Sequence, residues 1–316
     1  MKKLKGILMI LTLSASAIIG CATPIHYSTS TSSPTNIANT TRWASQENPS
    51  SSPVPLWDVW GTSASDVFAV GGLGTILKYN GKTWTNISSG TMNDLWGVWG
   101  TSSSDVFTVG VNTILDFDGK VWNQMDMGTL ALLNGIWGSS ASDVFAVGNV
   151  DVVFHYDGKD WTQWASTNWG DLYSIWDSSS KNIFAVGSGG VILHYDGKAW
   201  TKVKSNTTED LWDVWGSSFN NIFAVGNDGF ILHYNGKTWT ILDSGTTENL
   251  YGVWGSSSNN VFAVGNGGTI LHWDGKTWSS VSSGVTSNLI KVWGSSASDV
   301  FVVGDSGTIL HYSGPY

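Results

Sequence analysis

The stretch LWDVWGTSASDVFAVGGLGTILKYNGKTW, residues 56–84, recurs with small changes until the chain ends. Successive anchor tryptophans in these copies are 38 or 39 residues apart. They are Trp60, Trp99, Trp137, Trp176, Trp215, Trp254 and Trp293. A constant period of this length is typical of radially repeated folds, and one unit is too short to bury a core alone. The seven units are therefore expected to share one core.

Each unit contains four short segments rich in β-branched and aromatic residues, in the first copy LWDVW, DVFAV, TILKY and KTWTNI. Gly, Ser, Asn or Asp residues separate them, which predicts four strands. Asn80-Gly81 and its equivalents predict a two-residue type I′ turn between the third and fourth strands. Gly71 and its equivalents end the second strand, where we expect a bend that excludes a Cβ. Four antiparallel strands repeated around an axis make a β-propeller.

The two ends of the repeat array predict how the ring closes. The seventh unit stops near Tyr312 and lacks a tryptophan-bearing fourth strand, whereas Thr41-Arg42-Trp43 precedes the first unit. The fold class expected is all-β: a seven-bladed β-propeller of four-stranded antiparallel blades, closed by the N-terminal strand that completes the last blade. Such closure leaves no open edge. The anchor tryptophans are expected to lie between blades.

The N-terminal region predicts export. We expect three parts: a signal peptide at 1–20, a flexible tether rich in Ser, Thr, Pro and Asn at 21–40, and the propeller at 41–316. A basic start and a short apolar run end in Ile18-Ile19-Gly20-Cys21. This resembles the lipobox of bacterial lipoproteins, which implies that Cys21 carries the lipid. The alternative is an ordinary signal peptide followed by an incidental cysteine.

The resemblance to lipoproteins implies a location. Two or three acyl chains are enough for stable attachment to a membrane. Ala22 follows the cysteine where inner-membrane retention typically shows Asp, which favours the outer membrane or the cell surface. The expected localisation is therefore the bacterial cell envelope.

Charge argues against nucleic acid as a partner. The formal net charge is −9 and falls to −12 when Lys2, Lys3 and Lys5 leave with the signal peptide. An acidic surface repels phosphate backbones. Arg42 is the only arginine in the sequence, so the usual bidentate reader of phosphate is almost absent. We expect a monomer whose partner belongs to the envelope.

The candidate chemical groups recur in every unit, which favours structural roles. Five histidines share one repeat position: His155, His194, His233, His272 and His311. Equivalent positions on different blades cannot converge on one metal ion. The repeated Asp66 and its equivalents precede the second strand, where a side chain that caps a turn is expected. We predict no catalytic residue, no metal and no cofactor.

One position of the innermost strand varies between small, polar and charged residues, and we predict that it lines the central channel. Its polar members are Asp58, Ser174, Asp213 and Lys291. Asp58 and Lys291 lie on blades that meet at the ring closure, so we expect them to form an ion pair. Asp58 and Asp213 are also a candidate carboxylate pair of a hydrolase, although nothing in the sequence indicates a perturbed pKa.

The repeat resembles the kelch and Asp-box (BNR) repeats of propellers, and uncharacterised bacterial secreted proteins with VWGSS, DVFAVG and HYDG units. In Asp274-Gly275-Lys276-Thr277-Trp278 the Asp and Gly are adjacent, whereas Asp-box turns have one residue between them. Asp-box sialidases use an arginine triad, which one arginine cannot supply. The lipid-anchored photosystem II assembly factors are similar in architecture, but they use an arginine patch that this chain lacks.

Binding is best sought where the units disagree. In the loops that enter the next blade, Met92, Leu130 and Trp169 stand where later units have Thr208, Thr247 and Thr286, and Leu132 replaces a common Asp or Asn. Trp57, Trp96 and Tyr173 lie nearby at the second position of the first strand. We predict that Trp57, Met92, Trp96, Leu130, Leu132, Trp169 and Tyr173 form a partner-binding or ligand-binding patch. The alternative is that the aromatic residues pack against neighbouring blades.

Three functions remain open. The first is a non-catalytic scaffold that docks a protein of the envelope. The second is a lectin-like propeller that binds glycans, in which Asn168 and Asp171 beside Trp169 would supply the polar contacts. The third is a hydrolase with its active site at the mouth of the channel.

Overall fold

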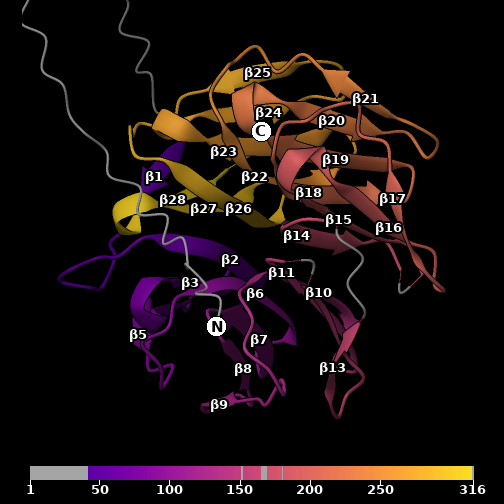
Figure 1. Cartoon of the computed structure of the whole chain (residues 1–316). Coiled ribbons are helices and arrows are strands. Elements are labelled where there is room, and N and C mark those ends of the chain that lie inside the picture. The colour runs from indigo at the N-terminus through magenta and orange to yellow at the C-terminus, as the bar shows by residue number, and fades with distance from the viewer. Residues whose placement is uncertain (1–41, 151, 165–168, 180, 315–316) are drawn as a thin grey trace, which may run out of the picture. The chain divides into compact units, whose positions relative to one another are not determined.

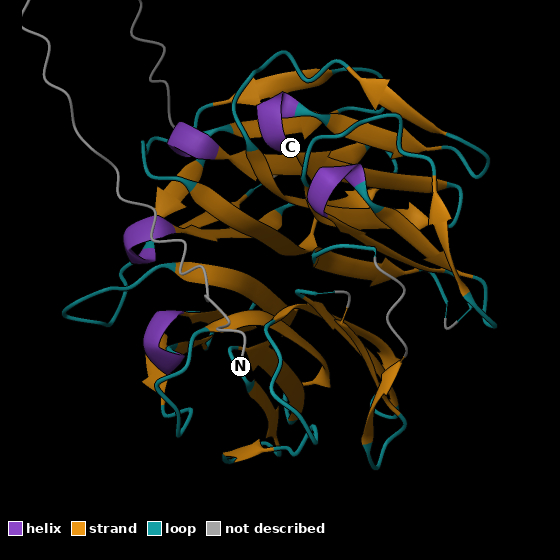
Figure 2. Ribbon diagram, viewed as in Figure 1, coloured by secondary structure: helices purple, strands orange, loops and turns teal. Residues whose placement is uncertain are grey.

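Seven four-stranded antiparallel sheets form the described part of the chain (Figures 1 and 2). This computed structural model describes residues 42–150, 152–164, 169–179 and 181–314, and these belong to one compact unit. The predicted seven-bladed β-propeller is confirmed. Nearly all the regular structure is strand, and the short helices shown in purple in Figure 2 are single turns.

Innermost strands contact one another in a closed cycle around the axis. They are β2 (Leu56–Ser63), β6 (Leu95–Ser102), β10 (Leu133–Ser140), β14 (Leu172–Asp177), β18 (Leu211–Ser218), β22 (Leu250–Ser257) and β26 (Leu289–Ser296). The second strands are β3 (Asp66–Gly71), β7 (Asp105–Gly110), β11 (Asp143–Gly148), β15 (Ile183–Gly187), β19 (Asn221–Gly226), β23 (Asn260–Gly265) and β27 (Asp299–Gly304). Blades are numbered 1 to 7 in this order.

Two outer strands complete each blade. The third strands are β4 (Ile76–Tyr79), β8 (Thr113–Phe117), β12 (Val152–Tyr156), β16 (Ile192–Tyr195), β20 (Ile231–Tyr234), β24 (Ile270–Trp273) and β28 (Ile309–Ser313). The outermost strands are β5 (Trp84–Ile87), β9 (Trp122–Gln124), β13 (Trp161–Trp164), β17 (Trp200–Val203), β21 (Trp239–Leu242), β25 (Trp278–Val281) and β1 (Trp43–Ser45). Five blades also have a 3₁₀ turn after the second strand: η1 (Gly72–Gly74), η2 (Ser188–Gly190), η3 (Asn227–Gly229), η4 (Asn266–Gly268) and η5 (Asp305–Gly307).

The N-terminal strand closes the ring as predicted. Strand β1 pairs with β28 in the register Trp43↔Tyr312, and it completes the sheet that contains β26 and β27. Figure 1 shows β1 (indigo) beside β28 (yellow), although the two are at opposite ends of the sequence. The last blade therefore has the same four strands as the others, and no strand edge is left between the first and last units.

The anchor tryptophans lie between blades, as predicted. A Cβ built on Gly100 of β6 would stand 2.9 Å from Cη2 of Trp60, which comes from β2 of the preceding blade. The same close contact recurs between Trp215 of β18 and Gly255 of β22 at 2.7 Å. Each indole thus occupies the space that the glycine of the next blade leaves free, and these contacts tie neighbouring sheets together.

The predicted type of the turn between the third and fourth strands was wrong. The turn at Asn80-Gly81 is not a two-residue type I′ turn, because Tyr79 pairs with Trp84 and Asn80 does not have a positive φ. Instead the Oδ1 atom of Asn80 accepts the N–H groups of Lys82 and Thr83, both at 2.9 Å, so the side chain organises a four-residue loop. Gly81 supplies the positive φ, 89°.

The glycine that ends the second strand is needed for close packing and not for a bend. Gly71 has an extended backbone, with φ −167°. A Cβ at this position would lie 2.2 Å from the carbonyl oxygen of Pro55, and the equivalent Gly110 would meet the carbonyl oxygen of Asp94 at 1.9 Å. The chain entering the first strand passes too close to this position for any side chain.

Candidate functional site

Connections between antiparallel strands alternate between the two ends of each blade, so the propeller has two different faces. On one face, which we call the loop face, the turn after each second strand meets the loop that enters the next blade. Hydrogen bonds from Leu73 N to Asp94 Oδ1 at 2.8 Å and from Gly189 N to Asp210 Oδ1 at 2.7 Å join these two kinds of segment. The other face, the turn face, contains the hairpins between the first and second strands and the turns between the third and fourth, as the approach of Gly81 to Ser65 shows.

Exposed apolar side chains are distributed unevenly over the loop face. Among the described residues, Ile241 of blade 5 is 53% exposed and lines a groove together with Thr208. The five other large hydrophobic side chains exposed on this face belong to blades 1–3 or the loops that leave blades 1 and 2. They are Leu73 (57%), Met92 (71%), Leu130 (80%), Leu132 (38%) and Val150 (78%). We call these five residues the apolar patch. Blades 4–6 carry the exposed Thr208, Thr247 and Thr286 at the position of Met92 and Leu130.

Two members of the patch occupy a backbone conformation that disfavours them. Leu73 and Val150 have φ of 54° and 59°, and a β-branched residue in this left-handed region is an outlier. The equivalent residues of four other blades are Gly189, Asp228, Gly267 and Ser306. Leu73 and Val150 were not among the predicted site residues. Aligning the copies at this position would have revealed them.

Asp and Asn residues before the first strand support this turn. The N–H of Val150 bonds to Asp171 Oδ1 at 2.8 Å, as that of Leu73 does to Asp94. Leu132 stands in place of this Asp in blade 2, whose turn is one residue shorter, and it forms a β-bridge with Val111. Its carbonyl oxygen accepts the N–H of Asn149, the neighbour of Val150. The patch residues of blades 2 and 3 are therefore joined through adjacent backbone.

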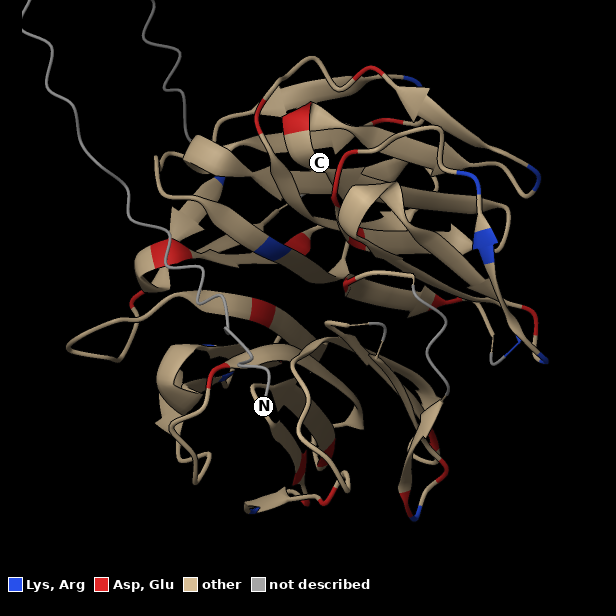
Figure 3. Cartoon of the chain, in the orientation of Figure 1, with Lys and Arg blue, Asp and Glu red and all other residues tan. Residues whose placement is uncertain are grey.

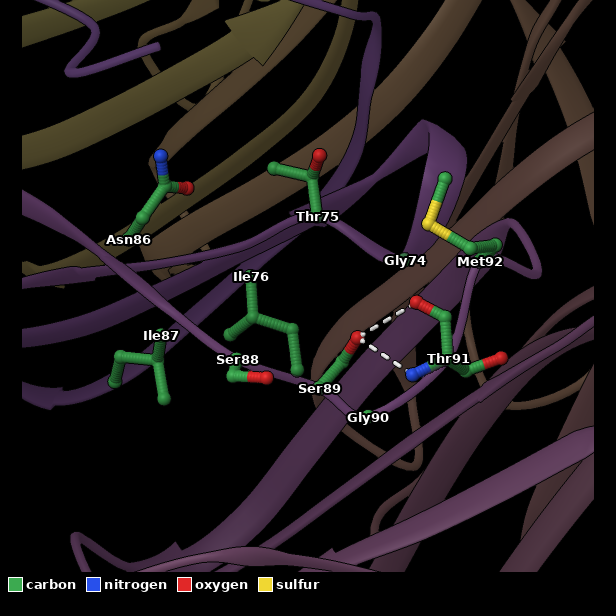
Figure 4. A pocket seen from close by; sticks show the side chains of 10 residues that line it. All are labelled: Gly74, Thr75, Ile76, Asn86, Ile87, Ser88, Ser89, Gly90, Thr91 and Met92. Carbon is green, nitrogen blue, oxygen red and sulfur yellow. Dashed lines mark hydrogen bonds between the residues drawn. The ribbon is translucent and has the colours of Figure 1, made fainter.

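Met92 borders a groove at the outer part of blade 1. The groove has a volume of about 610 Å³, and Figure 4 shows Met92 beside Gly74, with the Ser89 hydroxyl bonded to the backbone of Thr91. A groove of about 810 Å³ occupies the equivalent place on blade 4, where the residue at the position of Met92 is Thr208. The backbone therefore forms the same depression twice, and the side chains differ.

The predicted aromatic residues are less exposed than the aliphatic ones. Trp57, Trp96, Trp169 and Tyr173 are half-buried. Tyr173 stacks on Trp212 of the next blade, with 4.4 Å between ring centroids, and its burial raises the pKa of the phenol to about 12. Trp169 packs on the core between blades 3 and 4. Trp57 Nε1 is buried without a hydrogen-bond partner. These contacts favour the alternative, in which the aromatic side chains pack between blades.

The predicted ion pair in the channel was wrong. Lys291 Nζ lies 2.7 Å from Asp213 Oδ1 of blade 5, and not in a salt bridge with Asp58. Lys291 passes Gly252 of the intervening blade, where a Cβ would stand 2.9 Å from the Cα of Lys291. Figure 3 shows the basic segment of β26 and the acidic segment of β2 near the centre of the ring.

The expectation of an unperturbed carboxylate pKa in the channel was wrong for Asp58. Burial, and to a smaller extent the charge of Asp213, raises the pKa of Asp58 to about 6 against the opposing effects of Lys291 and the backbone N–H of Val98. Burial alone would lower the pKa of Lys291, but the charges of Asp213 and Asp58 outweigh it and raise this pKa.

The channel carboxylates bond to neighbouring blades. Asp213 Oδ1 accepts bonds from Ser174 Oγ at 2.6 Å and Lys291 Nζ, and its Oδ2 accepts the N–H of Val253 at 2.9 Å. Asp58 accepts the N–H of Val98 at 2.8 Å. Both carboxylates thus tie blades together, and Asp213 is buried, with an exposed fraction of 2%.

The repeated histidines are hydrogen-bonded inside their own blades, as predicted. His233 Nε2 lies 2.7 Å from Asn221 Oδ1, and His311 Nε2 lies 2.7 Å from Asp299 Oδ1. The same position pairs with the start of the second strand in blades 3, 4 and 6. Among the described residues no group of three His, Cys, Asp or Glu side chains is arranged to hold a metal ion.

Asp177 is a buried exception that the sequence reasoning missed. It stands where the other six blades have glycine after the anchor tryptophan, its exposed fraction is 4%, and its Oδ2 has no hydrogen-bond partner. Burial, with a contribution from Asp143, raises its pKa to about 7. The strand β14 ends at Asp177, whereas the equivalent strands continue for two residues past the glycine.

Comparison with known proteins identifies the fold. No family model matches the chain, and no curated protein matches it. Three solved structures are similar to it. YCF48 bound to D1 peptide has 19% identity and a TM-score of 0.73, over 87% of this chain and 96% of that one. YCF48 from Cyanidioschyzon merolae has 17% identity and a TM-score of 0.70, over 86% and 98%. The WD40 propeller domain of Doa1 has 12% identity and a TM-score of 0.71, over 85% and 95%.

These likenesses show that the chain has the propeller fold. At such identities they do not extend to the residues of a site, and the resemblance to kelch and Asp-box repeats stays a prediction. Cys21 and Asn168 lie outside the described residues. In the part of the chain that the structure describes, no helix is long and apolar enough to cross a membrane.

Proposed function

We propose that this protein is a lipid-anchored propeller of the bacterial cell envelope that docks a protein partner through the apolar patch on its loop face. The carrying observation is the restriction of exposed Leu, Met and Val side chains on this face to blades 1–3. Exposed apolar groups that gather on one side of a monomer are typical of interaction sites. A symmetric fold does not require this asymmetry, because blades 4–6 form the same loops with threonine.

Backbone strain supports the same conclusion. A non-glycine residue in the left-handed region costs roughly 1 kcal/mol or more, and Leu73 and Val150 are also left in water. Asp228 and Ser306 have a similar positive φ on other blades, so what sets Leu73 and Val150 apart is an exposed apolar side chain in this conformation. The similar propeller YCF48 is described as bound to D1 peptide, which supports a peptide or protein as the kind of ligand that this architecture accepts.

Attachment to the membrane is the part of the proposal that rests on the sequence. The run Ile18-Ile19-Gly20-Cys21 supports lipidation of Cys21, and residues 22–40 would then hold the propeller at the outer membrane or the cell surface. Replacing Cys21 by alanine is expected to move the protein from the membrane fraction to the soluble fraction. Retention of Cys21→Ala in the membrane fraction would contradict lipid anchoring.

The docking surface is tested by introducing at Met92 and Leu130 the threonine that blades 4–6 carry at the equivalent position. A pulldown from the native envelope with the variant Met92→Thr/Leu130→Thr is expected to capture at least about tenfold less partner than the wild-type protein, because two exposed anchors are removed. Val121→Thr/Ile241→Thr is the matched control, since Val121 and Ile241 are 54% and 53% exposed but lie outside the patch. Equal capture of the partner by both variants would contradict the proposed docking surface.

A further inference from the structure

The loop face is strongly acidic. Its turns and loops carry ten described carboxylates, which are Glu47, Asp94, Asp126, Asp171, Glu209, Asp210, Asp228, Asp243, Glu248 and Asp305. In these same described segments the basic side chain is Lys204, in the loop between blades 4 and 5. These segments therefore carry a formal charge of −9, which equals the formal charge of the whole chain.

The turn face has a different balance. Lysines occupy the turn between the third and fourth strands in six blades: Lys82, Lys120, Lys159, Lys198, Lys237 and Lys276. The Asp residues of these turns accept backbone N–H groups of their own turn, as Asp118 does from Lys120 and Val121 at 2.9 Å. These bonds lower the pKa of Asp118. Positive and negative groups thus alternate on the turn face, whereas the loop face carries mainly one sign.

Carboxylates adjoin the members of the apolar patch. Asp94 Oδ1 is 2.8 Å from the backbone N of Leu73, and Asp171 Oδ1 is 2.8 Å from that of Val150. Asp126 is exposed in the loop that presents Leu130 and accepts the N–H of Gly128 at 2.8 Å. No described loop-face residue of blades 1–3 is a lysine or an arginine. A partner that buries the patch therefore places its own side chains in a negative electrostatic potential.

We infer that the occupant of the apolar patch is a protein segment that carries both apolar side chains and Lys or Arg side chains. This inference rests on the proposed docking function and adds the chemistry of the partner. Apolar contacts supply affinity, and charge complementarity selects the partner and speeds association. An acidic segment or a membrane rich in anionic lipid would be repelled over the Debye length of about 8 Å at physiological salt.

Synthetic peptides of equal length test the charge and the apolar part separately. The probes are a Lys–Leu peptide, a Glu–Leu peptide of the same pattern and a Lys–Ser peptide, each titrated against the full-length chain in detergent by fluorescence anisotropy. We expect the Lys–Leu peptide to bind at least about tenfold more tightly than either other peptide. Its affinity should fall at high salt and in Met92→Thr/Leu130→Thr.

Charge variants locate the effect. Asp126→Lys is expected to weaken binding of the Lys–Leu peptide about tenfold. Asp243→Lys is the matched change in the loop between blades 5 and 6, because Asp243 Oδ1 accepts the N–H of Gly245 at 3.0 Å as Asp126 accepts that of Gly128, and it should weaken binding much less. Asp126 is exposed, so the substitution leaves the core unchanged. Equal effects of the two substitutions would overturn the inference, because the field would then act without regard to the patch.

The remaining outcomes separate this inference from the docking proposal. Equal binding of the Glu–Leu and Lys–Leu peptides would overturn the inference, but apolar docking would stand. If no peptide binds but the pulldown still depends on the patch, the inference is likewise overturned and apolar docking stands. Patch-dependent binding to phosphatidylcholine vesicles without peptide binding would overturn both and assign the face to lipid.

Discussion

Blades 1 and 4 form the same turn after their second strand with very different residues. Leu73 has φ 54° and ψ 35°, and its equivalent Gly189 has φ 60° and ψ 31°. The residues that follow the two turns, Thr75 and Val191, share φ −64° and ψ 128°. The backbone therefore accepts glycine without strain, and the leucine of blade 1 is both strained and 57% exposed.

A second difference between the same two blades is buried. Gly61 of blade 1 lies against Trp293 of blade 7, where a Cβ would stand 2.9 Å from the indole Cη2 atom. Blade 4 has Asp177 at this position, and it lacks the register shift that the other six blades show after the glycine. Blade 1 is thus regular inside and unusual at its surface, whereas blade 4 is the reverse. A departure from the repeat at the surface indicates binding, whereas a buried departure is expected to lower the free energy of unfolding.

Converting blade 1 to the pattern of blade 4 is expected to have the largest effect. Gly61→Asp places a carboxylate against Trp293 and the carbonyl oxygen of Asp66, which would lie 2.5 Å from the new Cβ. A buried unpaired charge combined with overpacking is expected to lower the free energy of unfolding by about 3–5 kcal/mol. Urea denaturation followed by tryptophan fluorescence measures it. A loss below about 1 kcal/mol would mean that this position tolerates a side chain.

The reverse conversion, Asp177→Gly, is expected to stabilise the protein in a way that depends on pH. The pKa of Asp177 is raised to about 7 in the folded state, against about 4 in the unfolded chain. The folded state therefore holds the proton more tightly, and stability is lost as pH rises from about 4 through about 7. Removing the carboxyl should raise the free energy of unfolding by about 2–4 kcal/mol at about pH 8.

At about pH 3, below the pKa of about 4 in the unfolded chain, the carboxyl is mostly protonated in both states and the gain from Asp177→Gly should nearly vanish. Asp177→Asn is the control for shape, because it keeps the volume and removes the charge, and it should flatten the same part of the pH profile. Differences from wild type in urea midpoint across this range are the measurement. A gain for Asp177→Gly that is equal at both ends would show that packing, and not titration, separates the two blades here.

Exchanging the exposed turn residues is expected to have the smallest effect. Leu73→Gly should raise the free energy of unfolding by about 1 kcal/mol because it relieves the left-handed strain, and Gly189→Leu should lower it by about 1 kcal/mol. Thermal or urea denaturation checks both. A loss of stability in Leu73→Gly would indicate that Leu73 has a structural role, and would weaken the case for the patch.

The repeat allowed much of this architecture to be predicted. The number of blades, the strands within each blade, the position of Trp60 between sheets and the pairing of Trp43 near Tyr312 all follow from a period that the chain repeats seven times. The turn at Asn80 could not be typed, because whether an Asn side chain bonds its own loop depends on where the chain continues. The partner of Lys291 could not be found either, since a lysine can pass over a glycine to the second blade away.

The sequence by itself determined the propeller, because a unit of 38 or 39 residues can bury its strands only against other copies of itself. It also marked Met92, Leu130 and Leu132 as departures from the repeat. Only the tertiary structure decided which departures reach the surface. Burial and cross-blade contacts place Tyr173 and Trp169 in packing and leave Leu73 and Val150 exposed, and the position of a side chain between two blades depends on residues of both.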